Sequence, residues 1–183
     1  MTTAAPLRLV PWWELPQPTD VSWALAAGRV ARAAAVGASD VLFAALAEVC
    51  AQVAGWRLFT VLVVDHDHGL ARRVHTSDPA VYPMGGGKPF AGSELGDTAF
   101  VDGRAFIAET PAELERVFPD HETIVALGCG AALNVPVRHR GEVIGSVNLL
   151  DEPMAYRTDA AAAVGPLAQF TAATLIGLSG RNR

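Results

Sequence analysis

The sequence predicts an α+β domain whose central antiparallel sheet is covered by helices. Three observations lead to this prediction: two helix-forming segments precede the first strand-like segment, short turns join neighbouring strand-like segments, and an apolar segment with helical spacing ends the chain. Short turns join antiparallel neighbours, whereas parallel strands need helical crossovers that this order does not supply. The expected order is helix, helix, strand, strand, loop, helix, strand, helix, strand, strand, helix.

Length and composition are those of one folded domain. The chain has 183 residues, of which 51% are hydrophobic and 18% charged. A chain of this length can bury roughly two-thirds of its unfolded surface. We expect a proline-rich arm over residues 1–19 and a single domain over residues 20–183.

The arm is expected to be extended, because each of its prolines removes a backbone donor and disfavours helix for the preceding residue. Trp12 and Trp13 are large apolar side chains on a segment that cannot form its own core. They are expected to dock on the body of the domain or on a second subunit.

The distribution of charge argues against a nucleic-acid partner. The chain has 14 basic and 19 acidic residues, a net charge of -5, and the basic residues are scattered. No apolar run approaches the ~20 residues that cross a bilayer, and the N-terminus lacks the basic and apolar regions of a signal peptide. We therefore expect a cytoplasmic protein without a membrane partner.

Two helices are predicted ahead of the sheet. Asp20 is a suitable N-cap for an alanine-rich helix to about residue 35, and Gly37 ends this helix. Ser39 is expected to cap a second helix through residue 54. Cys50 lies at helical spacing with the apolar residues of the second helix, which predicts a core position for this thiol.

Residues 56–64 and 70–76 are expected to form a hairpin. The first segment is dense in aromatic and β-branched residues, and Asp-His-Asp-His-Gly between the two predicts a turn. His66 and His68 in this turn resemble a metal-binding run, but a four-residue tip is a weak site without a distant ligand. We predict no metal ion and no other cofactor.

A long loop is predicted over residues 77–92, where prolines and the run Gly85-Gly86-Gly87 leave little room for regular structure. This run with Lys88 resembles the end of a phosphate-binding loop. However, no Ser or Thr follows, and Pro89 prevents the helix that would bind phosphate. Two interpretations stay open: a lid whose Lys88 faces an anionic ligand, or a plain flexible loop.

The second half of the chain alternates helices and strands. Thr110, Pro111 and Glu113 predict a capping box that opens a helix to about residue 118. The other expected elements are a short helix from Ser93 through residue 100, a strand over 105–108, a short helix over 121–127, a hairpin of 131–138 and 142–150 around residues 139–141, and a final helix over 158–178 with a kink at Gly165–Pro166.

Cys129 lies between Gly128 and Gly130, just before a predicted buried strand. These glycines would let a substrate approach closely, so Cys129 is a candidate nucleophile or acid/base, with His121 as its partner. The helix dipole at the start of the 121–127 helix favours a neutral imidazole. The alternatives are a small buried thiol and a solvated histidine at a helix cap.

The segment Ala-Leu-Asn-Val-Pro-Val-Arg-His-Arg-Gly-Glu-Val-Ile-Gly-Ser-Val-Asn-Leu-Leu-Asp, residues 132–151, resembles the GAF domain family. The resemblance rests on Val135-Pro136-Val137 at the end of one strand, Gly141 in the turn, and Val143-Ile144-Gly145-Ser146-Val147 in the next strand. Residues 56–64 and 103–106 match upstream strands, so the resemblance covers about residues 39–178. Gly145 suits a point where a ligand or a helix approaches the strand closely.

Membership of this family would imply a sheet with a small-molecule pocket under the loops and short helices, and a homodimer formed through the terminal helices. The polar residues expected near that pocket are His75, Tyr82, Lys88, Glu94, Asp97, Thr98, His121, Glu122, Cys129, Asn134, Ser146 and Asn148.

Asn134 and Asn148 lie in strands that are otherwise apolar, so their amides need partners. A three-residue turn at 139–141 would place Asn134 opposite Ser146, with Asn148 next on the same face. A two-residue turn would place Asn134 and Asn148 on opposite faces. The alternative role for both amides is to satisfy backbone groups at strand ends.

The expected function is therefore binding of a small polar organic molecule in a lidded pocket, by a chain without an attached output domain. The alternative is an enzyme of small molecules that uses Cys129. In size the chain resembles the free methionine-(R)-sulfoxide reductases of the family, but it lacks their several pocket cysteines. Attachment of a tetrapyrrole and binding of a cyclic nucleotide are less favoured, because no residue set for either is found.

Overall fold

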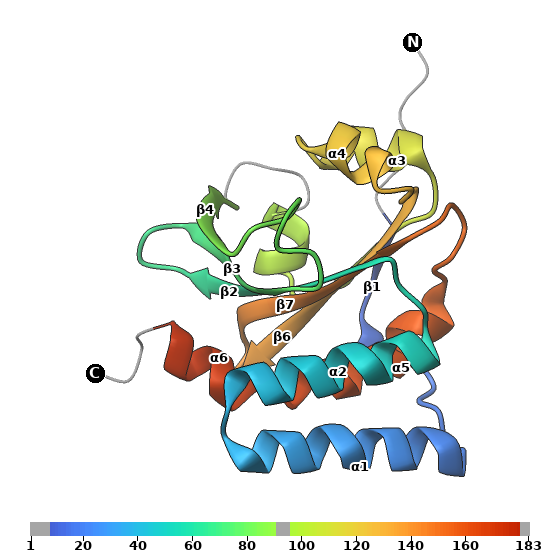
Figure 1. Ribbon diagram of the computed structural model, residues 1–183, viewed down its shortest axis with the longest axis vertical. Coiled ribbons are helices and arrows are strands. Elements are labelled where there is room, and N and C mark those ends of the chain that lie inside the picture. Colours follow the sequence, from blue (N-terminus) through green and yellow to red (C-terminus); the bar gives the residue numbers. More distant parts are fainter. Residues whose placement is uncertain (1–7, 91–95, 180–183) are drawn as a thin grey trace.

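The computed structural model describes residues 8–90 and 96–179 of the chain. They form a seven-stranded sheet in the order β1-β5-β6-β7-β2-β3-β4, and every neighbouring pair of strands is antiparallel (Figure 1). The strands are β1 (Arg8–Val10), β2 (Leu58–Asp65), β3 (Leu70–Thr76), β4 (Gly85–Pro89), β5 (Ala105–Ala108), β6 (Ala131–His139) and β7 (Glu142–Asp151). The predicted α+β class with an antiparallel sheet is confirmed.

Helices cover both faces of this sheet (Figure 1). One face carries α1 (Val21–Val36), α2 (Ser39–Val53), α5 (Thr158–Gln169) and α6 (Ala172–Leu178), with α1 outermost. The other face carries the π-helix η2 (Gly96–Val101), α3 (Pro111–Val117) and α4 (His121–Ala126). The larger apolar core fills the space between the sheet and α2 and α5, and a smaller one lies under α3 and α4.

The capping signals of the sequence were mostly correct. Asp20 accepts a backbone N–H from the first turn of α1, and Gly37 ends that helix with φ of 83°. Thr110 and Glu113 form the predicted capping box at the start of α3. The predicted cap at Ser39 is wrong, because this residue is already helical and the N-cap position holds an alanine.

The loop predicted over residues 77–92 contains a strand, so this prediction was wrong for Gly85–Pro89. β4 pairs with β3 at the edge of the sheet, where Pro89 lies opposite Leu70. An edge strand tolerates proline because its outer side needs no N–H donor. Ser93, the predicted start of the next helix, lies outside the described residues.

The N-terminal arm docks on its own chain. After β1 pairs with β5, a 3-10 turn, η1 (Trp12–Glu14), places the Trp12 indole against Gly165 of α5. Trp12 is buried there, and Trp13 lies under the guanidinium of Arg138, 4.6 Å from it. The sequence left two docking sites open for Trp12, the body of the domain and a second subunit. The structure shows Trp12 docked on the body of its own domain.

The final helix is broken, but not where the sequence predicted. α5 continues through Gly165–Pro166, and the bend of 60° lies between α5 and α6. The Thr171 hydroxyl donates to the Ala168 carbonyl at 2.7 Å, and the Thr171 N–H donates to the same carbonyl at 3.0 Å. These bonds to residue i−3 tighten the last turn and stop the regular i−4 ladder.

The β6–β7 hairpin has a two-residue turn, so the predicted three-residue turn is wrong. His139 pairs with Glu142, and Arg140 and Gly141 take φ of 51° and 88°. A bulge then inserts one extra residue in β7, because Val137 pairs with Gly145 while Arg138 pairs with Val143. The extra residue shifts the register by one.

As a result, Asn134 lies directly opposite Asn148, and Ser146 lies opposite Pro136. The pairing of Asn134 with Ser146 that a three-residue turn would give does not occur. Of the two arrangements left open, the structure shows Asn134 and Asn148 on a shared face, and the bulge produces it, because a two-residue turn alone would place them on opposite faces.

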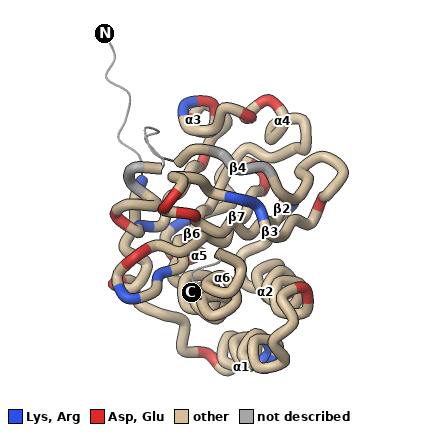
Figure 2. The backbone as a smooth tube through the Cα atoms, turned by 90° about the vertical axis from the view of Figure 1, so that its left-hand side faces the viewer, with Lys and Arg blue, Asp and Glu red and all other residues tan. Residues whose placement is uncertain are grey.

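Charged residues are dispersed over the described part of the chain. On the side drawn in Figure 2, Lys and Arg are interspersed with Asp and Glu and form no continuous basic strip. No single described helix is both long and apolar enough to cross a bilayer. Only the bent pair of α5 and α6 meets that test, by combined length and composition.

Candidate functional site

A cavity of about 590 Å³ opens on the sheet face that carries α3 and α4. Strands β2, β3, β6 and β7 form its floor, and its walls come from residues 82–90, from η2 and from residues 117–124. The described residues that contribute polar side chains to its lining are Thr60, Arg73, Tyr82, Asp120, Asn134 and Asn148. Most of the remaining lining is apolar or aromatic, so the cavity offers few polar contacts.

Three polar side chains cross the floor in one row. The sheet register places Asn134 of β6, Asn148 of β7 and Thr60 of β2 side by side. Asn134 Nδ2 donates to Asn148 Oδ1 at 2.8 Å, and Asn148 Nδ2 donates to Thr60 Oγ1 at 3.2 Å. All three residues are at most 7% exposed. The row is a buried amide relay, and it ends on Asn134.

Tyr82, Asp120 and Arg73 join the loop before β4 to the segment between α3 and α4. The Tyr82 hydroxyl donates to Asp120 Oδ2 at 2.5 Å, and the Arg73 guanidinium lies 4.5 Å from the centre of the Tyr82 ring. Arg73 also donates to the carbonyl of Pro83 at 2.9 Å. These contacts close one side of the cavity.

Burial shifts the pKa values of Tyr82 and Arg73 in this group. It raises the pKa of Tyr82, and the hydrogen bond to the Asp120 carboxylate raises it further, because the phenolate would face that negative charge. Burial also lowers the pKa of Arg73, while Tyr82 and Asp120 oppose this shift. At neutral pH Tyr82 is therefore a neutral donor.

Several residues predicted for the pocket lie elsewhere. His75 is on the opposite face of the sheet, with its ring 5.5 Å from that of Phe43 in α2, and burial lowers its pKa. Glu122 is exposed on α4, and neither it nor His121 lines the cavity. Ser146 is buried beside Pro136 and also does not line the cavity.

Other predicted residues lie where the structure gives no side-chain description. Glu94 is outside the described residues. Lys88 belongs to β4, and Asp97 and Thr98 belong to η2, but only their backbone is described. These four residues remain predictions.

Cys129 packs in the smaller apolar core and is 2% exposed. It does not line the cavity, and in the described part of the chain no hydrogen bond joins it to His121. The His121 ring instead lies 3.1 Å from the carbonyl of Phe118. Burial raises the pKa of Cys129 to about 11, and the Asp151 carboxylate adds to this shift while Arg57 opposes it.

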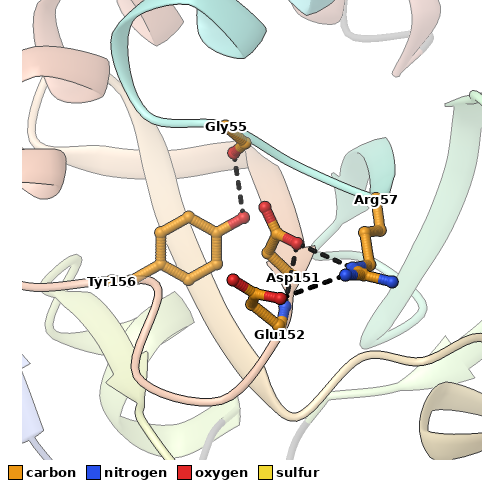
Figure 3. Close-up of polar contacts among 5 residues, drawn as sticks. All are labelled: Gly55, Arg57, Asp151, Glu152 and Tyr156. Atoms are coloured by element: carbon orange, nitrogen blue, oxygen red, sulfur yellow. Dashed lines mark hydrogen bonds and ion pairs between the residues drawn. The ribbon is translucent and has the colours of Figure 1, made fainter.

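Asp151 and Arg57, the charged groups that act on the pKa of Cys129, are paired with each other (Figure 3). Arg57 donates to Asp151 at 3.0 Å and to Glu152 at 3.1 Å, and the Tyr156 hydroxyl donates to the carbonyl of Gly55 at 3.0 Å. The cluster fastens the segment before β2 to the end of β7. Because Arg57 and Glu152 are well exposed, solvent screens their ion pair, and it contributes little to stability.

Both thiols of the native protein are therefore expected to resist alkylation. At neutral pH, a rise of the Cys129 pKa from 9.0 to about 11 lowers its thiolate fraction about 100-fold, and Cys50 is fully buried with a raised pKa. Iodoacetamide labelling followed by mass spectrometry should find both cysteines unreacted in native protein and both labelled in urea. Rapid native labelling of Cys129 would contradict this result.

The sequence interpretation missed Thr60 and Arg73 as lining groups, and it did not connect Asp120 with Tyr82. Thr60 had the same signal as Asn134, a polar residue in an apolar strand, and could have been found by the same reasoning. Arg73 and Asp120 are ordinary surface residues in sequence, and only the fold brings them to Tyr82. Within the described residues, no three His, Cys, Asp or Glu side chains are arranged to hold a metal ion.

Comparisons with known proteins agree on the fold. A family model of the GAF domain matches residues 37–175. The GAF domain from an Acinetobacter phosphoenolpyruvate-protein phosphotransferase superposes with a TM-score of 0.67 at 13% identity, covering 90% of this chain and 98% of that one. The GAF domain of a two-component sensor histidine kinase from Bacillus halodurans gives 0.64 at 11% identity, covering 80% of this chain and 99% of that one.

A free methionine-R-sulfoxide reductase from Neisseria meningitidis, solved in complex with its substrate, superposes with a TM-score of 0.61 at 19% identity. The match covers 92% of this chain and 98% of the reductase. A search of curated proteins finds no match for the chain. At these identities the superpositions establish the fold alone.

Proposed function

The chain belongs to the GAF domain family, and we propose that it binds a small organic molecule in the cavity between its sheet and helices α3 and α4. The observation that carries this proposal is the buried amide relay on the cavity floor. Amides placed among apolar side chains cost free energy unless they are bonded. A relay that ends in an apolar cavity is the arrangement expected for orienting a ligand.

The cavity has the size and lining typical of small-molecule sites. Such sites measure roughly 300–1,000 Å³ and combine apolar walls with a few placed polar groups. The cavity of about 590 Å³ falls in this range, and its polar groups come from the floor and from one wall. These features favour a largely apolar ligand over the more polar one that the sequence suggested.

Catalysis by Cys129 is not part of this proposal. The thiol is buried outside the cavity lining, its pKa is raised to about 11, and His121 makes its contact with Phe118. A nucleophilic cysteine needs a lowered pKa and access to substrate. The structural likeness to a reductase supports the fold and no particular reaction.

Filling part of the cavity is expected to weaken binding without unfolding the protein. Ala71 lies on β3 in the cavity floor and is 6% exposed, so the ring of an Ala71→Phe variant would occupy ligand space. Affinity for the ligand should fall at least about 10-fold, since the overlap would cost more than about 1.4 kcal/mol. Native mass spectrometry of freshly purified protein would identify a retained compound, and calorimetric titration would then compare its affinity for each variant.

The matched control is Ala51→Phe, which places the same ring on the exposed side of α2, away from the cavity. It should bind like the natural chain. Equal affinity of the Ala71→Phe and Ala51→Phe variants would show that the compound binds elsewhere, and the proposed function would be wrong.

A further inference from the structure

We infer that the ligand of this cavity is an uncharged aromatic compound that donates one hydrogen bond, from an N–H or O–H group, to Oδ1 of Asn134. This inference rests on the proposed function and adds the chemical class of the ligand. Three features carry it: the direction of the amide relay, the aromatic side chains of the walls, and the balance of charge.

The backbone of Thr60 sets the direction of the relay. Asn148 Nδ2 lies 3.5 Å from the Thr60 carbonyl oxygen and 3.2 Å from Thr60 Oγ1. A carbonyl oxygen only accepts, so Asn148 must present its NH₂ group to Thr60 and its Oδ1 to Asn134. Asn134 then uses Nδ2 toward Asn148 at 2.8 Å and presents Oδ1 elsewhere.

This arrangement leaves the acceptor Asn134 Oδ1 without a donor. The residue lines the cavity and is 7% exposed, and in the described part of the chain its Oδ1 is fully shielded and has no hydrogen-bond partner. A buried acceptor without a partner is unfavourable, and a ligand donor would satisfy it once a small rotation of the Asn134 side chain turns Oδ1 toward the cavity. The relay therefore selects a ligand that donates at this point.

Aromatic side chains from separate segments form the walls above this acceptor. Phe90 and Phe100 have ring centres 5.7 Å apart at an angle of 50°, and Phe118 lines the cavity from the end of α3. Rings prefer offset or edge-to-face contact with other rings. These walls suit a flat aromatic body.

The ionisable groups of the lining offset each other. The Arg73 guanidinium lies against the Tyr82 ring, and the Tyr82 hydroxyl donates to the Asp120 carboxylate. One positive and one negative group therefore contact the same tyrosine. Arg73 also donates to Pro83. The described lining therefore presents no net charge, and a charged ligand would lose its hydration without an ionic partner.

Two pairs of probes test the donor directly. 2-Naphthol and indole each carry one donor, whereas 2-methoxynaphthalene and benzothiophene have similar shapes and no donor. Equilibrium dialysis against the full chain should show that each donor probe binds at least about 10-fold more tightly than its partner. 2-Naphthoate, which has the same ring system and a negative charge, should bind more weakly than 2-naphthol.

A variant pair ties the discrimination to Asn134. Asn134→Leu should reduce the difference within each probe pair to less than about 2-fold, because the acceptor is gone. Ser146→Ala removes a buried hydroxyl that does not line the cavity and should keep the full difference. The wild-type comparison stands even if Asn134→Leu does not fold.

Equal binding within both probe pairs, or tightest binding by 2-naphthoate, would overturn the inferred ligand class. The same holds if none of the aromatic probes binds while a non-aromatic compound does. In each of these cases the proposed function survives as long as Ala71→Phe blocks the compound that binds. Binding that Ala71→Phe leaves unchanged would instead refute the proposed function itself.

Discussion

A Gly145→Ala variant is expected to lose about 3 kcal/mol of its free energy of unfolding, at the upper end of what overpacking costs in a core. Gly145 lies in β7 where a Cβ atom would overlap the carbonyl oxygen of Leu62 in β2 and lie 2.8 Å from Cδ1 of Leu175 in α6. The oxygen belongs to the backbone of a neighbouring strand, so relief would require the two strands to move apart. Urea denaturation followed by circular dichroism measures the loss.

The control for this variant is the next residue of the same strand. Ser146 is 1% exposed, and its hydroxyl has no hydrogen-bond partner in the described part of the chain. Ser146→Ala should change the free energy of unfolding by no more than about 1 kcal/mol, because it removes no bond and leaves only a small gap. A Gly145→Ala variant as stable as Ser146→Ala would show that β7 can shift away from β2 at little cost.

A Gly165→Ala variant is expected to lose about 2–3 kcal/mol. Here the added Cβ would overlap the indole of Trp12, with Cγ of that ring 2.8 Å away. The obstacle is a side chain on the N-terminal arm, so the arm can partly detach, and the cost is that of undocking Trp12. Tryptophan fluorescence and urea denaturation should both report the change.

Gly177→Ala is the matched control, because α6 contains this glycine with nothing within 4 Å of an added Cβ. Alanine favours helix over glycine by up to about 1 kcal/mol, so this variant should be as stable as the natural chain or more so. In a Trp12→Ala background, Gly165→Ala should cost less than in the natural chain. Additive losses would mean that Trp12 and Gly165 do not act on each other.

Several elements of this fold were predictable from local signals. The capping box at Thr110 and Glu113 and the glycine that ends α1 need only a few neighbouring residues, and the structure has both. The close approach expected at Gly145 is also correct, and the neighbours are the Leu62 backbone of β2 and Leu175 of α6. The strand Gly85–Pro89 was missed because its stability comes from pairing with β3, which its own residues do not indicate.

The candidate site shows the same division between local and distant signals. The apolar strands around Asn134 and Asn148 indicated that both amides need partners. Their pairing with each other depends on a bulge, which the hairpin sequence does not indicate. The bond from Tyr82 to Asp120 spans 38 positions, and Arg73 reaches the Tyr82 ring from β3. The glycines beside Cys129 suggested a reactive thiol, whereas residues far away in sequence bury it.

The pairing of β1 with β5 has a consequence for aggregation. All four residues of β5 are buried, and β1 covers the side of β5 that would otherwise carry unpaired N–H and C=O groups. If the arm detaches, this apolar strand becomes an open edge, which is a template for pairing with another molecule. The tryptophan that holds the arm in place therefore also keeps β5 from pairing with a second molecule.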